Sequence, residues 1–499
     1  MSKAKTVAEL KLSGYKRLSV RQELRKNLIA KLKSGEQLFP GIIGYDDTVI
    51  PALCNALLSY HDFILLGLRG QAKTRILRAL PNLLDEFIPV IKGSEINDDP
   101  FHPVSKYAVE LLNTHGDDVE IEWLHRDERY GEKLATPDVT IADLIGDIDP
   151  IKAASQRLHY AHEGVIHFGI IPRTNRGVFA INELPDLQPR IQVGLFNIMQ
   201  EKDIQIRGFP IRIPLDIVIA YSANPEDYTN RGSIITPLKD RIGSQIMTHY
   251  PHTITDGIEI TSQEAFVKRD TGKQTQVPYF MRELVEQIAF EARKSEFVDQ
   301  KSGVSVRMTV TTMENLISNA ERRTIKTGES EIAPRVCDLY AAVPSITGKV
   351  ELVYEGEQEG EINVSLALIG KAVKSIFSNY FSDPLIAMKK GDTTYADIVS
   401  WFKNEQLIEI SDDTPFSDYI KELRKVTGLE KLVSSQMQID DSNEHELAAA
   451  MEFVLDGLHH FSMLSKDNVD TKIAYRDMLD TMFSSLGRGQ DDFFTDEDI

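Results

Sequence analysis

From about residue 39 the chain alternates short, continuous apolar runs with longer stretches whose apolar residues recur at helical spacing. Short apolar runs bounded by polar or turn residues are typical of buried strands, whereas spacings of three and four residues indicate helices. The expected strands are 63–66, 177–181, 216–220 and 245–248, and the expected helices beside them are 46–59 and 73–84. Strands that alternate with helices predict an α/β domain around a parallel sheet, which we place at 39–254.

Beyond residue 255 the pattern becomes mainly helical, with the clearest helical spacing over 278–294 and 309–323. We divide this part into a helical lid at 255–349, a mainly helical C-terminal region at 350–490 and an acidic tail at 491–499. A Glu- and Gly-rich stretch at 354–361 suggests a solvated hairpin or a boundary. The segment 86–175 is expected to contain inserted elements, because structureless loops of that length are uncommon in compact domains.

The first 38 residues form a separate, basic and amphipathic segment. Leu24, Leu28 and Leu32 fall on one face of a predicted helix, and Gly35 follows as a stop. Residues 1–35 hold ten lysines and arginines against two glutamates, although the whole chain has a net charge of −20. Two interpretations stay open: a helix packed on its own domain with a solvated basic face, or a basic arm that docks on an acidic neighbouring subunit.

The composition excludes several classes of protein. The net charge of −20 argues against a broad nucleic-acid-binding surface. No apolar run approaches the ~20 residues of a membrane span, and the basic start is not followed by the apolar core of a secretory signal. The two cysteines, Cys54 and Cys337, are too far apart in the sequence for a metal cluster, and two cysteines are too few for a disulfide scaffold. These features predict a cytoplasmic protein.

The candidate chemistry begins with a glycine loop between a predicted strand and a predicted helix. The loop reads Gly67-Leu-Arg-Gly70-Gln71-Ala72-Lys73-Thr74. In a phosphate-binding loop of this kind the backbone N–H groups surround the phosphates, the lysine reaches the β- and γ-phosphates, and the Thr hydroxyl is offered to Mg²⁺. The departure from the pattern is Ala72, which stands where the last glycine is expected. The alternative is a plain strand–helix turn with a surface lysine.

A second element is the apolar strand that ends in Asn182-Glu183. A nucleotide-hydrolysing site needs a magnesium-orienting group and a general base at the end of such a strand. Glu183 can polarise the attacking water. Asn182 stands where an aspartate is usual, so it brings no negative charge to the metal, and Asn182→Asp is expected to lower the requirement for Mg²⁺. The alternative is a buried strand with a solvated end.

Further polar residues follow in a regular order. The strand 216–220 leads to Asn224, which could hold the lytic water together with Glu183. Arg241 comes next, at the expected edge of the domain, where it could reach a neighbouring subunit's γ-phosphate and stabilise charge in the transition state. Arg231 is a second candidate for that role, and Arg307, ahead of a predicted helix, could close onto bound nucleotide. Any single arginine is more often a surface ion pair.

This order of elements resembles the AAA+ ATPases, and within them the magnesium-chelatase small-subunit and MoxR-type branch, over roughly residues 40–345. The segments that carry the resemblance beyond the loop are 144–150, 162–164, 168–177, 190–201, 204–208 and 239–243. The resemblance implies an AAA+ P-loop NTPase core with a parallel sheet and flanking helices, followed by a helical lid. Ala72 is familiar in the MoxR-type loop, whereas Asn182 is a departure that bears on the rate of hydrolysis.

The resemblance also implies roles and partners. Lys73, Thr74 and Glu183 would bind and hydrolyse ATP with Mg²⁺, Asn224 would act as the sensor of the water, Arg241 as the finger given in trans, and Arg307 as the second sensor. Members of the family are ring-forming motors, commonly hexamers, that remodel a partner protein. They often act with a protein bearing a von Willebrand factor A domain, which would be a separate chain here because no D-x-S-x-S occurs in this sequence.

Three other functions are alternatives to a remodelling motor. The first is a nucleotide-binding scaffold with weak hydrolysis, because of Asn182. The second is the ATPase subunit of a genuine magnesium chelatase, which would need a large porphyrin-binding subunit. The third, a transcription activator of the wider superfamily, is disfavoured because its Gly-Ala-Phe-Thr-Gly-Ala loop and C-terminal helix-turn-helix are not found in the sequence.

Overall fold

The computed structural model describes residues 3–152, 163–206, 212–225, 233–404, 406–411, 413–440, 442–469 and 472–478. The chain splits into two units, Met1–Tyr250 and Pro251–Ile499. Among the described residues, no helix combines the length and the hydropathy that a membrane span requires. The acidic tail predicted at 491–499 lies outside the described residues.

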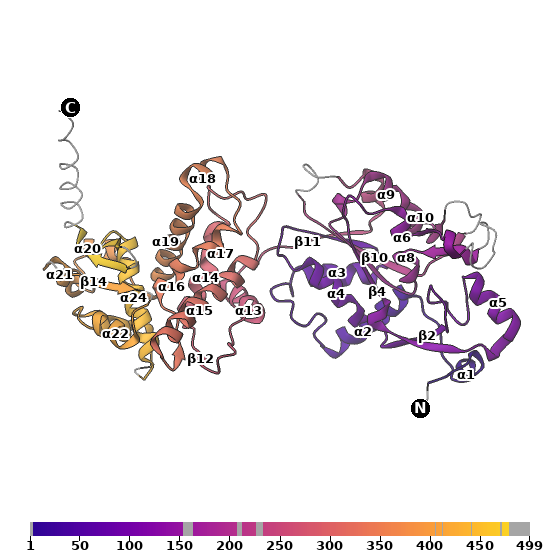
Figure 1. Cartoon of the computed structure of the whole chain (residues 1–499), viewed down its shortest axis with the longest axis horizontal. Coiled ribbons are helices and arrows are strands. Elements are labelled where there is room, and N and C mark those ends of the chain that lie inside the picture. Colours follow the sequence, from indigo (N-terminus) through magenta and orange to yellow (C-terminus); the bar gives the residue numbers. More distant parts are fainter. Residues whose placement is uncertain are drawn as a thin grey trace. The chain divides into compact units, whose positions relative to one another are not determined.

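Unit 1 is built on a sheet of five parallel strands in the order β11-β1-β10-β7-β4. The strands are β11 (Ser244–Met247), β1 (Phe63–Leu66), β10 (Ile217–Ala223), β7 (Gly177–Asn182) and β4 (Tyr130–Leu134). The α/β fold class with a parallel sheet is therefore confirmed (Figure 1). Four of these strands match the apolar runs in the sequence, and β4, which has a mixed sequence, is the one that the pattern missed.

The register of the sheet brings the carboxyl ends of the central strands to one edge. Leu66, the last residue of β1, pairs with Ala223 of β10 and with Met247 of β11. On the other side of β10, β7 ends at Asn182, which pairs with Leu134 of β4. Ligands of parallel α/β sheets bind outside this edge. The loops that begin after β1, β7 and β10 are thus placed together.

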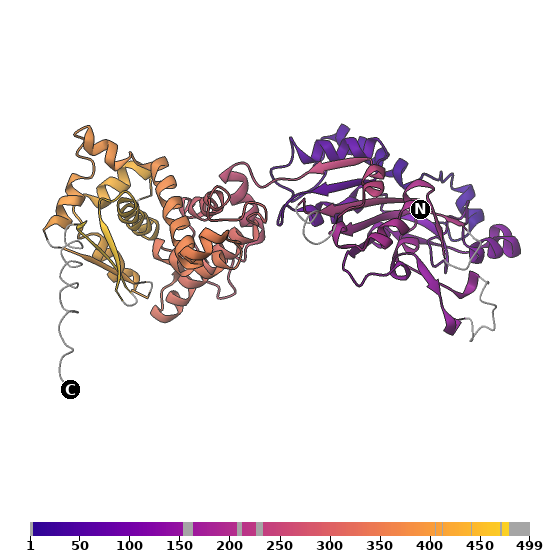
Figure 2. The same ribbon diagram turned by 90° about the horizontal axis from the view of Figure 1, so that it is seen from above.

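Helices cover both faces of the sheet because successive strand residues point to opposite sides. Phe63 and Leu65 belong to one core, together with residues of α2 (Val20–Ser34), α3 (Val49–Leu58) and α4 (Lys73–Ala79). Ile64 and Leu66 belong to the other core, which includes residues of α6 (Ile141–Leu144), α8 (Ile170–Arg173), α9 (Pro189–Gly194), α10 (Phe196–Gln200) and α12 (Thr236–Arg241). Figure 2 shows the sheet of this unit between its two layers of helices.

The basic N-terminal segment packs on its own unit. Leu24 and Leu28 of α2 are buried in the core that covers one face of the sheet, whereas Leu32 is 49% exposed. A shorter helix, α1 (Val7–Leu12), packs instead in a small separate core with the antiparallel pair of β2 (Phe87–Ile91) and β3 (Ile121–His125). The first of the two interpretations of this segment is confirmed for α2.

The segment 86–175 contains inserted elements, as predicted. Besides β2, β3 and β4 it holds α5 (Lys106–His115) and a second antiparallel pair, β5 (Gly146–Ile148) with β6 (Ile166–Phe168). The helix predicted over 73–84 is shorter than expected. It ends at Ala79 and continues as the 3₁₀ turn η1 (Leu80–Leu83), because Pro81 has no N–H to donate and disrupts a continuous α-helix.

Unit 2 is mainly helical and shares one hydrophobic core. Its longest helices are α13 (Ile254–Glu264), α14 (Tyr279–Ala292), α15 (Arg307–Thr327), α19 (Glu361–Tyr380) and α24 (Glu444–His460). Shorter helices are α16 (Val336–Ala341), α17 (Val343–Thr347), α18 (Tyr354–Glu359), α20 (Pro384–Lys389), α21 (Ala396–Lys403), α22 (Phe416–Leu423) and α23 (Leu429–Met437). Two small sheets complete it, β12 (Gln274–Thr275) with β13 (Glu331–Ile332), and β14 (Ile408–Ser411), β16 (Lys472–Arg476) and β15 (Ser465–Val469). The finer division of the chain at 38, 254, 349 and 490 stays a prediction.

The hairpin suggested at 354–361 is wrong. Tyr354–Glu359 forms the helix α18, and α19 starts directly afterwards at Glu361. Glutamate is a good helix former, and Gly356 packs so closely that an added Cβ would lie 2.4 Å from the carbonyl oxygen of Phe297. Gly360, with a φ of +92°, separates the two helices. The glycines therefore serve packing and a helix end, which the sequence pattern could not distinguish from a turn.

Candidate functional site

The glycine loop lies at the carboxyl edge of the sheet, directly after β1. Gly67 is buried, and its N–H donates to the carbonyl oxygen of Ala223 at the end of β10 (3.2 Å). A Cβ on Gly67 would lie 1.8 Å from Thr248 Oγ1 and 2.1 Å from Gln71 Oε1. Gly70 has a φ of +74°, a conformation in which glycine carries no steric penalty. The close contacts at Gly67 and the positive φ at Gly70 therefore both favour glycine.

Ala72 occupies the position where the pattern expects a third glycine, and its backbone is left-handed (φ +54°, ψ +13°). For a residue with a Cβ this conformation costs roughly 1–2 kcal/mol. Such strain persists only where the surrounding structure holds it, and it is concentrated at functional sites. At Ala72 the absence of glycine therefore means a strained left-handed backbone, which the surrounding structure holds in place.

Gln71 anchors the loop to the neighbouring strand-end residues. Its Oε1 accepts a hydrogen bond from the buried hydroxyl of Thr248 (2.7 Å), directly after β11. Its carbonyl oxygen accepts from the Tyr45 hydroxyl (3.0 Å), whose pKa is raised to about 12 by burial. Thr248 and Tyr45 were missed in the sequence, because only the fold brings residues so far apart in the chain to the loop.

The alternative interpretation of Lys73 as a surface lysine is wrong. The residue is only 7% exposed, and its ammonium group donates to the carbonyl oxygens of Gly67 and Leu68 (2.9 Å to Leu68). It therefore lies within the curve of the loop that a phosphate would enter. Thr74, the next residue of α4, is half-buried. Phosphate oxygens would compete with these carbonyls for the lysine.

Asn182, at the end of β7, is buried and has both ends of its amide engaged. Its Nδ2 donates to Glu132 Oε1 of β4 (2.6 Å), and its Oδ1 accepts from the hydroxyl of Ser222 of β10 (3.0 Å). Glu132 in turn accepts two hydrogen bonds from Arg78 of α4 (2.7 and 3.0 Å). Sequence reasoning missed both Glu132 and Ser222, and it identified Asn182 only as a metal ligand.

Glu183 follows Asn182 and is the general base expected from the sequence. Its backbone is left-handed (φ +53°, ψ +50°), and its N–H donates to Ser222 Oγ (3.3 Å). The residue is half-buried at the same edge as the glycine loop. A glutamate held in this conformation is strained, which is typical of residues that a site fixes in one direction.

Asn224 is 8% exposed and follows the last residue of β10. Among the residues that the structure describes, its Oδ1 has no hydrogen-bond partner. A buried amide oxygen without a partner costs about 1–3 kcal/mol, so the position favours a polar group that is bound there. This observation fits the predicted role of holding a water.

The structure describes two of the three candidate arginines, Arg241 and Arg307. Arg241, the last residue of α12, donates to Gln200 Oε1 (3.3 and 3.0 Å) and to the carbonyl oxygen of Pro237 (2.7 Å). Its guanidinium also lies over the Phe196 ring, 4.6 Å from the centroid. Arg307 is exposed at the start of α15 in unit 2, so its role at a site of unit 1 stays a prediction. Arg231 lies outside the described residues, as do parts of 162–164 and 204–208.

The residues at this edge fit a magnesium ion that is held mainly by phosphates. In the described part of the chain, no group of three or more His, Cys, Asp or Glu side chains is placed to hold a metal ion. Mg²⁺ is commonly bound by one or two protein oxygens together with substrate phosphates and waters. The hydroxyl of Thr74 and the amide oxygen of Asn182 are oxygen donors of the required kind, and the carboxylate of Glu132 lies next to Asn182.

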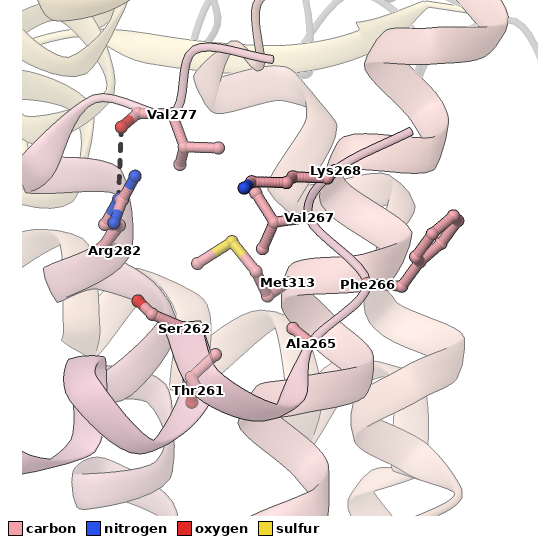
Figure 3. Close-up of a pocket in the computed structure, with 9 residues that line it drawn as sticks. All are labelled: Thr261, Ser262, Ala265, Phe266, Val267, Lys268, Val277, Arg282 and Met313. Atoms are coloured by element: carbon pink, nitrogen blue, oxygen red, sulfur yellow. Dashed lines mark hydrogen bonds between the residues drawn. The ribbon is translucent and has the colours of Figure 1, made fainter. Parts of the chain in front are cut away.

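A separate cavity of about 410 Å³ lies in unit 2. Figure 3 shows Lys268 beside the apolar side chains of Val267 and Met313, Arg282 on the other side of the cavity below Val277, and Phe266 pointing away. Arg282 Nε donates to the carbonyl oxygen of Val277 (3.3 Å). None of the residues predicted to act on nucleotide lines this cavity.

Behind the wall of this cavity lies a buried acid, which gives a testable pH dependence. Glu286 is 2% exposed and accepts from the Thr261 hydroxyl (2.5 Å). Burial raises its pKa to about 7, although this hydrogen bond and the charge of Arg293 oppose the rise. A raised pKa in the folded state means that stability is lost as the pH rises from about 4.5 to 7, on the order of 3 kcal/mol. We expect Glu286→Gln to flatten the fall in the free energy of unfolding between pH 5 and pH 8.

Urea unfolding of unit 2, followed at both pH values, measures this effect. Glu296→Gln, at an exposed position of the same unit, is the matched control and should keep the wild-type pH dependence. An unchanged pH dependence in Glu286→Gln would show that another group titrates.

No protein-family model matches the sequence. Among curated proteins, an archaeal Lon protease from Thermococcus kodakarensis is 28% identical over 165 residues, which are 30% of this chain and 25% of that protein. The chain thus spans a quarter of the length of that curated relative.

Solved structures that resemble the chain include the complex of subunits BchI and BchD of magnesium chelatase, with 18% identity, 64% of this chain and 98% of that chain covered, and a TM-score of 0.35. NtrX from Brucella abortus in complex with ATP gives 11% identity, 62% and 52% coverage and a TM-score of 0.31. Hsp104 with ATPγS and casein gives 13%, 63% and 51%, and 0.38. At this similarity none of them assigns a role to a residue of this chain.

Proposed function

We propose that this chain is an ATP-binding and ATP-hydrolysing motor of the AAA+ type. The observation that carries the proposal is the meeting, at one edge of a parallel sheet, of the glycine loop with its inward lysine, the strained Glu183, and the buried Asn224 oxygen. These are the parts that phosphoryl transfer requires: a cradle for phosphates, a group that activates water, and a group that orients it.

In this mechanism the loop binds and the strand ends act on water. The backbone N–H groups that follow Gly67, up to Lys73, donate to phosphate oxygens, and the ammonium group of Lys73 moves from the loop carbonyls to the β- and γ-phosphates. Asn224 Oδ1 accepts a hydrogen bond from the attacking water, and Glu183 accepts the proton that the water loses. Mg²⁺, bound near Thr74 and Asn182, would neutralise charge on the phosphates.

The assembly and the substrate belong to the same proposal. We infer a ring, in the family commonly a hexamer, in which Arg241 of one subunit acts on the nucleotide of the next, and in which Arg307 closes onto its own nucleotide. The motor would remodel a partner protein in the cytoplasm, together with a separate von Willebrand factor A domain protein. The ATPase subunit of a genuine magnesium chelatase is a narrower form of this proposal.

A second candidate function is a nucleotide-binding scaffold with weak hydrolysis. The observation in its favour is that Asn182 has no charge and that both ends of its amide are already engaged. Steady-state phosphate release from the purified protein distinguishes the two, since turnover well above the spontaneous rate of ATP hydrolysis contradicts the scaffold.

The loop assignment is tested by Lys73→Ala. Removing the ammonium should weaken ATP binding at least about 30-fold, because phosphate charge loses its buried partner. The buried position of Lys73 adds a second expectation, a loss of about 2 kcal/mol in the stability of the ligand-free protein, because two loop carbonyls lose a charged donor.

Isothermal titration with ATP and urea unfolding measure the two effects. The matched control is Arg75→Ala, two residues further along on the exposed side of α4. It removes the same charge and should change neither quantity much. Equal ATP affinity in Lys73→Ala and the wild type would refute the loop assignment.

A further inference from the structure

The last residue of β7 is Asn182, where such a site usually has an aspartate, but the acid Glu132 of β4 lies next to it. Glu132 is two residues before the end of β4, opposite Ala180, and its carboxylate reaches forward to Asn182 Nδ2 (2.6 Å). The side chain of Glu132 is 21% exposed, so its charge is partly shielded from water. At this edge of the sheet, Glu132 of β4 thus carries the negative charge that Asn182 of β7 lacks.

The carboxylate faces the side of the sheet on which the glycine loop continues as α4. Arg78 of α4, one turn after Thr74, makes both of its hydrogen bonds to Glu132. Residues four apart on a helix lie on one face. Glu132 is therefore beside the same face of α4 that presents the Thr74 hydroxyl.

The amide at position 182 is the residue that this arrangement allows. An aspartate there would place a second carboxylate against Glu132 at a contact that is now 2.6 Å, and like charges at that distance are not both ionised without a large cost. As an amide, Asn182 instead donates to Glu132 and accepts from Ser222, which fixes its orientation. Asn182 and Glu132 together therefore carry a single negative charge.

We propose that Glu132 is a positioning residue that supplies, from β4 and through Asn182, the negative charge for the magnesium ion of the ATP site. The inference rests on the proposed ATPase function. Partners of this kind behind a metal ligand typically change metal affinity 10–100-fold when they are removed. Arg78 pairs with Glu132, but its side chain is 64% exposed against 21% for Glu132, so water screens the charge of the arginine more than that of the carboxylate.

The experiment compares four variants by two readouts that do not depend on turnover. The variants are Glu132→Gln, Asn182→Asp, the exchange Glu132→Gln/Asn182→Asp, and the control Arg78→Gln. The first readout is the ratio of ATP affinities with Mg²⁺ and with EDTA, by isothermal titration. The second is the thermal unfolding of the full chain without nucleotide.

We expect Glu132→Gln to lower the Mg²⁺-dependent ratio about tenfold and to leave the affinity in EDTA unchanged. Asn182→Asp alone should unfold at a lower temperature than the wild type, because two carboxylates then face one another. The exchange variant should recover both the ratio and the unfolding temperature, since it returns the site to one charge. Arg78→Gln should keep or raise the ratio, because it removes a competitor for Glu132.

Three results overturn the inference: an unchanged ratio in Glu132→Gln, no recovery in the exchange variant, or a loss in Arg78→Gln equal to that in Glu132→Gln. The last would mean that Glu132 serves only its ion pair with α4. Failure of the proposed function looks different, because the wild type itself would then bind no ATP in either buffer.

Discussion

Glu183→Gln should bind ATP with near wild-type affinity and hydrolyse it about 10²–10⁴ times more slowly, the usual loss when a general base is removed. Glutamine keeps the size of the side chain, and the backbone N–H at this position still donates to Ser222. The variant loses only the ability to accept a proton from water. Single-turnover hydrolysis of radiolabelled ATP, beside isothermal titration, separates turnover from binding.

The matched control for this experiment is Glu201→Gln, which removes a carboxylate at an exposed position of the same unit. It should hydrolyse ATP like the wild type. Turnover by Glu183→Gln within a few-fold of the wild type would show that a different group activates the water. A loss of ATP binding as large as the loss of turnover would instead indicate that Glu183 supports the shape of the site.

The sheet could be predicted from the sequence to the extent that its strands are continuous and apolar. Strand β1 was placed residue for residue, and β7, β10 and β11 within a few residues. Strand β4 was missed because it lies at the end of the sheet and reads Tyr-Gly-Glu-Lys-Leu, in which polar residues interrupt the apolar pattern. With β4 the sequence also missed Glu132, the acid beside Asn182.

The local chain pattern identified the loop and the strand ends, but it could not give their contacts. The burial of Lys73 against its own loop and the anchoring of Gln71 by Thr248 both depend on the fold. The largest change concerns Asn182. Sequence alone predicts that Asn182→Asp helps magnesium binding, whereas the contact with Glu132 predicts a cost unless Glu132 is neutralised in the same molecule.

Arg241 is the residue whose role depends on assembly, and its surroundings make the test sharper. Within its own subunit the guanidinium is held by Gln200 and Pro237 and lies over Phe196. These contacts fix the end of α12 and would orient the charge before a neighbour's phosphate reaches it. In Arg241→Ala, ATP binding should persist, and hydrolysis should fall by about 10³–10⁵ if the arginine serves the transition state in trans.

Mixing two inactive variants distinguishes action in trans from action in the same subunit. Rings that combine Arg241→Ala with Glu183→Gln subunits contain interfaces with an intact Glu183 on one side and an intact Arg241 on the other. Activity should therefore return on mixing, because phosphate release needs one complete interface and not one complete subunit. If Arg241 only supports its own subunit through Gln200 and Phe196, Arg241→Ala lowers the unfolding temperature without a selective loss of turnover. If mixed rings form and stay inactive, the arginine does not act across the interface.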